Sequence, residues 1–361
     1  MSPTPRSTGS KAAPPTGGRA MIRDLGAGAT LPAAFDVRTA FDFAVSLASE
    51  VGQHEELPSE DRRWLEKARE ALPDRVRPAV DDETAIMGAG LMIDRPDVTD
   101  AASYVRALGA STGTEFAQIV LADNLRHHEQ SAVVQAAIDG DREAVERMLA
   151  DWPEQKRAWL RRLLDDADGM LAEVHDAMAA WLPMYAEIEP RVKAIIERDA
   201  DARAPELNTL RPSEVIERAT NGIRWLSEPG VRRVILAPSY LVRPYNFTFN
   251  GPDWRLFIYP VGDSALEPHD PLAPPASVLR LHRALGDDTR LRILRLLRDR
   301  DWYLTEIAER LELSKPTIKH HLAQLRAAGL VTLIEEGGLS YYSLRRDRLE
   351  DASTDLLRYL S

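Results

Sequence analysis

The feature that most constrains this chain is an ordered series of short amphipathic segments near its C-terminus. Apolar residues recur at helical spacing in residues 277–285, 288–297 and 304–311, which predicts three short helices. A tight turn at Leu313-Ser314 follows. Ser314 is a favourable N-cap for the next helix, and the proline two residues later occupies a first helical turn, where its missing N–H costs nothing.

The segments after this turn complete a definite order. Residues 315–328 predict a fourth helix that ends at Gly329, a residue suited to the left-handed conformation of a helix C-terminus. Residues 330–334 and 340–344 predict two strands joined by a Gly-Gly turn, and residues 347–360 predict a final helix. Helix, tight turn, helix and hairpin form the plan of a winged helix-turn-helix domain.

The fourth helix has two different faces. Ile318, Leu322 and Leu325 form the face that braces the helix against its neighbours. Small polar and basic residues occupy the opposite face and the flanks, mostly at the N-terminal end, which is the part of such a helix that meets base edges in the major groove. The candidate DNA-binding residues are therefore Ser314, Lys315, Thr317, Lys319, His320 and Gln324.

Four sequence segments in this region occur together and in order: LHRALGDDTRLRILRLL, LTEIAERL, LSKPTIKHHLAQLRAAGLV and YYSL. Jointly they resemble the ArsR-type family of winged-helix repressors, and the resemblance covers residues 277–361. It implies a transcriptional regulator that binds double-stranded DNA as a homodimer, with the helices at 277–285 and 347–360 in the dimer surface. The alternative is a winged helix that serves protein assembly, with the part of the chain before it a partner-docking module or an uncharacterised enzyme.

The chain departs from the ArsR pattern at three places. Family wings are usually basic, but here the tip carries Glu335 and Glu336. Metal-sensing members often place a cysteine pair where this chain has Tyr303 and Thr305, and the terminal helix holds no histidine for the family's other common metal site. We therefore expect no metal cofactor and DNA binding that does not depend on a transition metal.

The charge of the chain is unevenly distributed. The net charge is -11, but residues 277–361 hold 15 Lys and Arg against 13 Asp and Glu, so this segment is slightly basic. The acidity belongs to the larger N-terminal part, and a negative total does not argue against a local face that binds nucleic acid.

Composition narrows the class of protein further. Hydrophobic residues make up 44% of the chain, which is typical of globular domains. No apolar run approaches the length of a membrane span, and no hydrophobic segment near the N-terminus resembles a secretory signal. The chain has no cysteine, which excludes disulfides and thiolate metal sites and fits a cytoplasmic protein.

The chain before the winged helix predicts a large separate domain. Residues 231–237, 245–249 and 254–261 favour strands, and Asn250-Gly251 favours a hairpin turn between the last two. The rest of this part has helical spacing of its apolar residues. We expect a helical domain closed by a small antiparallel sheet, so the whole chain is mostly α with small β elements.

These observations predict four segments along the chain. Residues 1–30 are a disordered tail rich in small residues and proline, residues 31–261 the helical domain, residues 262–276 a proline-rich linker and residues 277–361 the winged helix. The segments LAPSYLVRPYNF and FIYPV resemble the long N-terminal half of certain bacterial ArsR-type regulators. That resemblance implies a domain that senses a ligand or mediates oligomerisation.

A small organic ligand would need a pocket in the helical domain. Large aromatic side chains supply an apolar lining, and Arg243 supplies an anchor for an anionic group. The candidate ligand-binding residues are Trp181, Tyr185, Trp225, Tyr240, Arg243 and Tyr245. For each of them the alternative is a structural role, because Trp181 and Tyr185, four residues apart on a helix, suit core packing and Arg243 suits an ion pair.

Other polar clusters favour no catalytic or metal chemistry. His127 and His128 are adjacent, so on a helix they point about 100° apart and do not easily share an ion. A group of acids at 165–168 near His175 is more typical of a charged helix surface. The sequence has no phosphate-binding loop, no dinucleotide fingerprint and no GxSxG motif, so we expect no enzyme activity.

Overall fold

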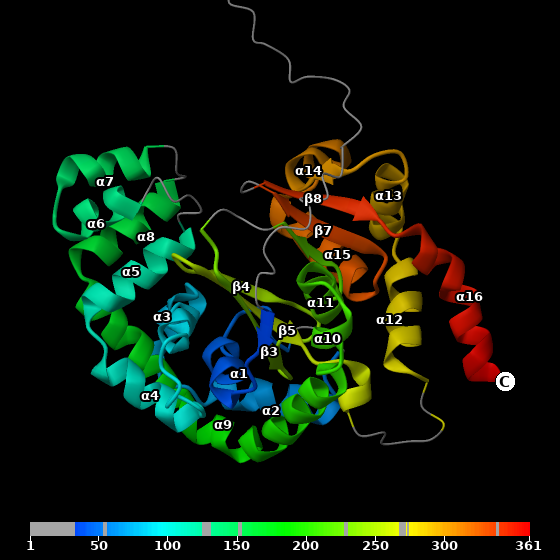
Figure 1. Cartoon of the computed structure of the whole chain (residues 1–361), viewed down its shortest axis with the longest axis horizontal. Helices are drawn as coiled ribbons and strands as arrows, with labels where there is room; N and C mark the ends of the chain where they lie inside the picture. Colours follow the sequence, from blue (N-terminus) through cyan, green and yellow to red (C-terminus); the bar gives the residue numbers. More distant parts are fainter. Residues whose placement is uncertain are drawn as a thin grey trace, which may run out of the picture. The chain divides into compact units, whose positions relative to one another are not determined.

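The computed structural model describes residues 33–52, 56–124, 131–150, 154–226, 230–266, 272, 274–336 and 339–361. These residues belong to one compact unit, Leu31–Ser361 (Figure 1). The tail predicted at residues 1–30 and the pair His127 and His128 lie outside the described residues. Within the described part, no helix is both long and apolar enough to cross a membrane.

The N-terminal part is mostly helical, as predicted. Helix starts are stabilised by acidic N-caps: the Asp100 side chain accepts from the Ser103 N–H at 2.7 Å, and Asp166 accepts from the Gly169 N–H at 2.9 Å. Its helices are α1 (Thr39–Val45), α2 (Ser59–Glu70), α3 (Arg77–Asp81), α4 (Ala101–Ala110), α5 (Gly113–Asn124), α6 (Ser131–Ile138), α7 (Arg142–Leu149), α8 (Glu154–Asp165), α9 (Ala167–Arg203), α10 (Glu206–Thr209) and α11 (Pro212–Ala219).

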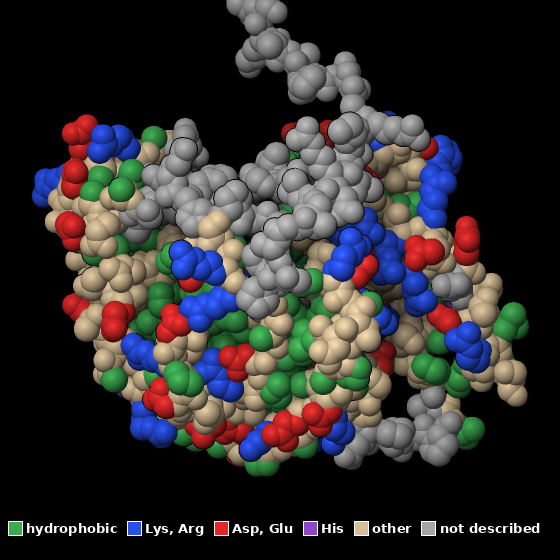
Figure 2. Space-filling model, viewed as in Figure 1, with side chains coloured by type: hydrophobic (Ala, Val, Ile, Leu, Met, Phe, Trp, Pro, Cys, Tyr) green, Lys and Arg blue, Asp and Glu red, His purple; other side chains and the backbone are tan. Residues whose placement is uncertain are grey.

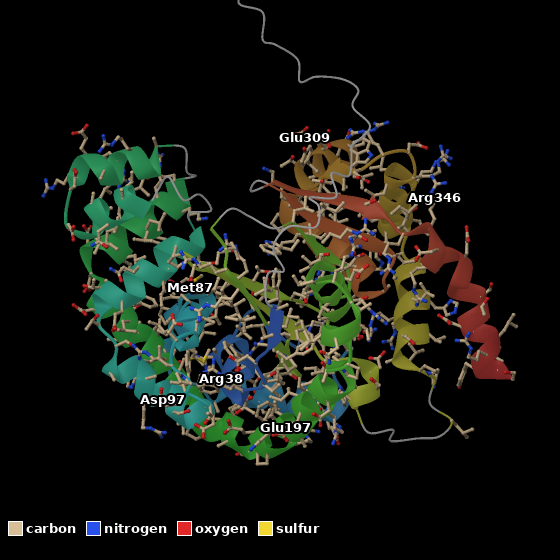
Figure 3. All side chains as sticks on the ribbon, viewed as in Figure 1. Arg38, Met87, Asp97, Glu197, Glu309 and Arg346 are labelled. Atoms are coloured by element: carbon tan, nitrogen blue, oxygen red, sulfur yellow. The ribbon has the colours of Figure 1, made fainter. Side chains whose placement is uncertain are left out.

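Short 3-10 turns connect several of these helices, at Asp74–Val76, Thr84–Ile86 and Ala89–Met92. One arginine holds the loop after the last of them in place. The Arg38 guanidinium, labelled in Figure 3, donates to the carbonyl oxygens of Arg95 and Val98, both at 2.8 Å. The start of α1 is thereby fixed to a segment far along the chain.

A four-stranded sheet crosses this domain in the order β1-β3-β5-β4. Its strands are β1 (Ala33–Phe35), β3 (Arg233–Ser239), β4 (Phe247–Asn250) and β5 (Trp254–Pro260). The predicted hairpin between β4 and β5 is present, with Phe249 opposite Leu256. The expectation of an antiparallel sheet is otherwise wrong, because β1 pairs with β3 and β3 pairs with β5 in parallel.

Burial explains the parallel arrangement. Alternate residues of β3 and β5 pack into two different cores, one containing α1 and α9 and the other containing α11 (Figure 1). Ile235 and Leu256 belong to the first core, and Leu236 and Phe257 belong to the second. A strand that is covered on both faces is apolar along its whole length, which is typical of parallel sheets.

The C-terminal part has the predicted winged-helix order, and its observed bounds agree with prediction to within about one residue, except at the hairpin strands. A hydrophobic core of its own includes Ile293, Ile307, Ile318 and Leu325. The elements are α12 (Ala276–Leu285), α13 (Asp288–Leu297), β6 (Trp302–Tyr303), α14 (Leu304–Leu311), α15 (Lys315–Ala327), β7 (Val331–Glu336), β8 (Leu339–Leu344) and α16 (Arg346–Leu360). The fold class is therefore mostly α with small sheets, as predicted.

A strand from the N-terminal part completes the wing sheet. β2 (Ile223–Trp225) pairs in parallel with β7, with Ile223 opposite Leu333, and gives the sheet the order β2-β7-β8-β6. The Leu333 N–H also donates to the Gly222 carbonyl oxygen at 2.8 Å. The predicted linker at 262–276 therefore does not separate two independent bodies, because backbone pairing crosses it. The short strands β1, β2 and β6 were not predicted, because they are only two or three residues long.

Candidate nucleic-acid interface

Helix α15 begins where the sequence predicts. The Ser314 Oγ accepts from the Thr317 N–H at 3.2 Å and lies 2.7 Å from the Thr317 Oγ1, so both hydroxyls organise the first turn. Gly329 ends the helix with a φ of +73°, a conformation that glycine adopts without strain. The turn and the helix are thus fixed by local interactions.

The two faces of α15 differ as expected. Ile318, Leu322 and Leu325 are completely buried in the winged-helix core. Lys315 and Thr317 are exposed, and Lys319 has 72% of its side chain exposed. A helix that binds in the major groove needs one face buried against its own domain and polar groups on the face toward solvent. Helix α15 has both.

His320 and Gln324 form a hydrogen-bonded chain on the same helix. The Gln324 Nε2 lies 3.0 Å from the His320 Nε2, and the Arg290 guanidinium on α13 donates to the Gln324 Oε1. Burial, assisted by the charge of Arg290, lowers the pKa of His320, so its imidazole is neutral near pH 7. Arg290 was not predicted to position these side chains, because it lies on a different helix.

The N-terminal part contacts one flank and the C-terminal half of α15. The Lys319 Nζ lies 3.9 Å from the Glu50 Oε1, and the Arg326 guanidinium donates to the Thr220 carbonyl oxygen at 2.8 Å. The Asn221 side-chain amide donates to the Ala327 carbonyl oxygen at 2.7 Å. The first turn of α15 stays exposed, whereas its last turns are held by the neighbouring domain.

Comparison with known proteins identifies the family. The family model described as bacterial regulatory protein, arsR family, matches residues 287–332. The transcriptional repressor SdpR of Bacillus subtilis is 37% identical over 79 residues, which cover 22% of this chain and 88% of SdpR. This chain belongs to the ArsR family.

Further similarities lie in the same region. The HTH-type transcriptional regulator CmtR of Mycobacterium tuberculosis is 37% identical over 83 residues, covering 23% of this chain and 70% of CmtR. The solved structure of HlyU from Vibrio cholerae N16961 is 33% identical, with a TM-score of 0.20, over 23% of this chain and 89% of HlyU. Because the sequence relatives SdpR and CmtR are transcriptional regulators and the family model covers the helix-turn-helix, the ArsR-type part is the winged helix of a DNA-binding transcriptional regulator.

The aromatic residues proposed to bind a ligand lie mostly in the core of this ArsR-family protein. Trp181 and Tyr185 are completely buried and hydrogen-bonded, the Trp181 Nε1 to the Ser46 Oγ at 2.7 Å and the Tyr185 hydroxyl to Asp42 at 2.8 Å. The buried Tyr240 hydroxyl donates to an Asp61 carboxylate oxygen. Such side chains, which are already packed and paired, have the structural role that sequence analysis gave as the alternative.

The other three candidates lie near the winged helix. Trp225 is on β2 and packs against Phe257, with ring centroids 6.5 Å apart. Burial, followed by the nearby Glu50 carboxylate, raises the pKa of Tyr245 to about 12. Arg243 is 3% exposed and pairs with Asp263 at 2.7 Å. Arg243 is the candidate ligand-binding residue that lines a cavity, which lies beside the winged helix.

The acidic residues near His175 have structural roles. Asp166 caps α9, and the Asp168 Oδ1 accepts from the Gly113 N–H at 2.7 Å. His175 lies 3.4 Å from Asp176 through its Nδ1. Across the residues that the structure describes, no group of three or more His, Asp or Glu side chains is arranged to hold a metal ion.

Proposed function

We propose that this ArsR-family regulator binds duplex DNA as a homodimer in the cytoplasm and that its N-terminal domain controls binding in response to a small ligand. The observation that carries the proposal is the exposed polar first turn of α15 on a helix whose opposite face is completely buried. One such helix contacts only a few base pairs, and two-fold symmetry doubles the contacted sequence.

The proposed dimer surface is an apolar face on the last helix. On α16, Leu357 is 66% exposed and Leu360 is 69% exposed, and α12 carries the partly exposed Leu279. Apolar side chains of this size gathered on neighbouring helices favour contact with a second copy. Light scattering should give a dimer for the parent and a monomer for Leu357→Glu, with Leu207→Glu on α10 as a control in the other domain.

A titration of the full-length protein with genomic DNA fragments at two salt concentrations tests DNA binding itself. We expect sequence-specific binding that weakens as salt rises, because bound Lys and Arg release counterions from phosphates. Binding that has no sequence preference, or no binding, would contradict the proposal.

The alternative is a winged helix used for protein assembly. It is favoured by the use of α15 and the β7 edge for contacts with the chain's own N-terminal part. Against it, an assembly surface is more apolar than the N-terminal end of α15, which carries Lys315, Thr317 and Lys319. The same DNA titration separates the two functions.

A further inference from the structure

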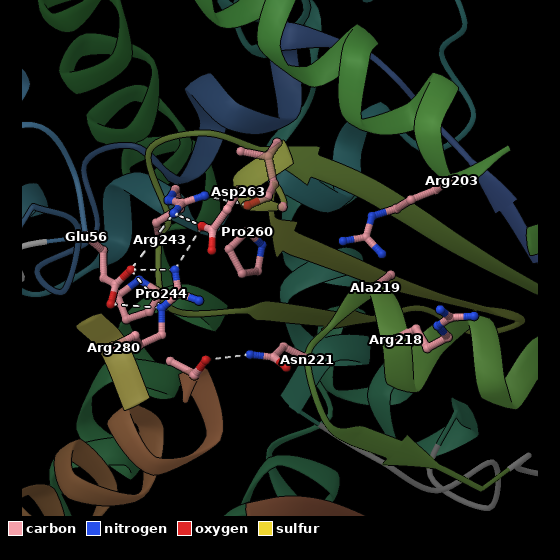
Figure 4. Close-up of a pocket in the computed structure, with 13 residues that line it drawn as sticks. Glu56, Arg203, Arg218, Ala219, Asn221, Arg243, Pro244, Pro260, Asp263 and Arg280 are labelled. Atoms are coloured by element: carbon pink, nitrogen blue, oxygen red, sulfur yellow. Dashed lines mark hydrogen bonds and ion pairs between the residues drawn. The ribbon is translucent and has the colours of Figure 1, made fainter. Parts of the chain in front are cut away.

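A cavity of about 210 Å³ lies at the junction of the two domains. Its wall contains Pro260, the last residue of strand β5, with residues 261–263 after it, and Arg243, which follows strand β3. The carboxyl ends of parallel strands form the edge at which open α/β sheets bind ligands. The winged helix contributes Arg280 from α12 (Figure 4) and also Ala327 from α15.

The wall has more cationic than anionic side chains. Four arginines line it, together with two carboxylates, Glu56 and Asp263; the arginines are Arg203, Arg218, Arg243 and Arg280. Figure 2 shows Lys and Arg side chains gathered where α11 and α12 lie in Figure 1. An arginine guanidinium matches the planar oxygens of a carboxylate or a phosphate.

One side of the cavity is a closed ion cluster. The Asp263 Oδ1 accepts from Arg243 at 2.7 Å and from Arg280 at 3.0 Å, and Glu56 accepts from Arg280 at 2.9 Å. Burial alone would raise the pKa of Asp263, but the charges of Arg280 and Arg243 lower it below its ordinary value. Asp263 is therefore ionised, and its bond to Arg280 joins the N-terminal domain to α12.

The other side is less well neutralised. Arg203 pairs with Asp199 at 3.0 Å, but the ion-pair partner of Arg218 among the described residues is Glu206 at 3.7 Å, which exceeds hydrogen-bond length. Arg218 is 60% exposed. Its guanidinium is thus largely exposed, on the side of the cavity away from the ion cluster (Figure 4).

A buried donor in the wall also lacks a partner. Arg243 is 3% exposed, and its Nε makes no hydrogen bond to any residue that the structure describes. A buried polar atom without a partner costs free energy, and a bound water or ion is one of the groups that can supply the missing partner. Together with the excess of arginine, this atom points to an anion.

We propose that this cavity binds a small organic anion with a carboxylate or phosphate group, and that this anion is the ligand that controls DNA binding. The proposal rests on the function proposed above. A volume of about 210 Å³ lies below the roughly 300–1,000 Å³ of pockets for drug-sized ligands, so the ligand is small.

The position of Arg280 links the cavity to α15. A second cavity of about 260 Å³ shares Glu56 and Arg280 with the first and adds Arg290 and Gln324, the pair that positions His320. An anion that binds Arg280 competes with Glu56 for the same guanidinium. Binding of the anion therefore weakens a contact between the N-terminal domain and the winged helix. The anion binds more tightly when this contact is broken than when it is formed, and coupling requires such a difference in affinity.

The test uses the full-length protein with inorganic phosphate and malonate as probes, at constant ionic strength set by chloride. We expect a saturable rise in melting temperature with one or both probes. Arg218→Gln should weaken probe binding about tenfold, by loss of one charge-assisted hydrogen bond. Arg224→Gln, which removes an exposed arginine on β2 outside the cavity, should leave probe binding unchanged.

The DNA titration repeated with and without the probe separates the two proposals. Probe binding that Arg218→Gln weakens, in a protein that does not bind DNA, would support the anion site and overturn the regulator. Specific DNA binding with no saturable effect of either probe, or with equal effects in both variants, would overturn the anion site and leave the regulator standing. A change in DNA affinity at a saturating concentration of the probe would support both the anion site and the DNA-binding regulator.

Discussion

At the scale of single residues, the N-terminal half of α15 offers two kinds of DNA contact. Lys315 is exposed and charged, so we expect it to contact phosphate, whereas the neutral, hydrogen-bonded His320 suits a base edge. Lys315→Ala should weaken binding to all sequences and lower the salt slope by about one unit. His320→Ala should instead change sequence preference, since a good base contact is worth about 1–3 kcal/mol of discrimination.

Fluorescence anisotropy with a specific and a scrambled duplex at several salt concentrations measures both effects. Lys67→Ala on α2, an exposed lysine of the N-terminal domain, is the matched control. If Lys315→Ala and His320→Ala bind both duplexes like the parent, α15 is not the DNA-binding helix.

The neighbouring His321 predicts how stability depends on pH. Burial lowers its pKa below the ordinary 6.5, although Asp287, 3.7 Å from its Nδ1, acts in the opposite direction. The unfolded chain therefore binds a proton more tightly than the folded chain, and stability falls as the pH drops below 6.5. Urea unfolding at pH 7.5 and 5.5 should show a smaller difference for His321→Gln than for the parent.

His282→Gln on α12 is the control for this prediction, because that histidine is exposed. His320 has a lowered pKa too, so part of the pH dependence should remain in His321→Gln. A variant whose stability changes with pH as much as that of the parent would exclude His321 as a source.

At the scale of elements, the link between domains depends on Gly222. Its φ is +107°, and a Cβ there would lie 3.1 Å from the Val331 carbonyl oxygen. Gly222→Ala should therefore strain the β2–β7 pairing and cost about 1–3 kcal/mol of stability. Hydrogen exchange of the β7 amides measures whether the pairing itself is loosened.

Gly140→Ala is the matched control, because Gly140 also has a positive φ, +89°, but open space around it. Both variants should lose stability through backbone strain. Faster exchange in β7 should appear in Gly222→Ala alone, and equal exchange in the two variants would show that β2 does not hold the wing sheet.

The elements also show how far sequence alone predicts this fold. The winged-helix elements were predicted closely because Ser314 and Gly329 mark helix ends by local chemistry. β2 was missed because three residues carry no periodicity and its partner, β7, is distant in the chain. The sequence does not predict the strand direction because the apolar run of β5, although it indicates burial on both faces, also fits one half of the hairpin with β4.

The candidate cavity was predicted less well than the DNA-binding helix. Arg243 was identified from its type, but the arginines that join it come from α9, α11 and α12, which no spacing brings together. The aromatic candidates were chosen by size, and size favours the core: Trp181 and Tyr185 are among the largest completely buried side chains. Residue type thus predicted the exposed face of α15, where the helix itself fixes the side chains, but not the cavity, whose arginines are brought together by tertiary structure.

At the scale of the whole molecule, the N-terminal domain holds part of the surface that DNA would approach. Glu50 lies against Lys319, and Asn221 holds the last turn of α15. A duplex seated along α15 brings phosphates to the same flank, where the Glu50 carboxylate would repel them. We therefore expect the domain contact and DNA binding to compete.

A reversible cross-link tests this competition, because the chain contains no cysteine and two introduced thiols react alone. Glu50→Cys and Lys319→Cys in one chain, joined by a bis-maleimide with a reducible spacer, should fix the domain contact and reduce DNA affinity. Typical coupling energies of about 1–3 kcal/mol predict a loss of roughly 5- to 150-fold, recovered when the spacer is reduced. The comparison is made within one variant, so loss of the Lys319 charge affects the cross-linked and the reduced protein equally.

The control is Glu146→Cys with Arg161→Cys, a pair inside the N-terminal domain whose side chains lie 3.5 Å apart, from the Glu146 Oε1 to the Arg161 Nη2. This variant should keep its DNA affinity when cross-linked. Equal affinity before and after reduction of the first pair would mean that the N-terminal domain does not restrain α15.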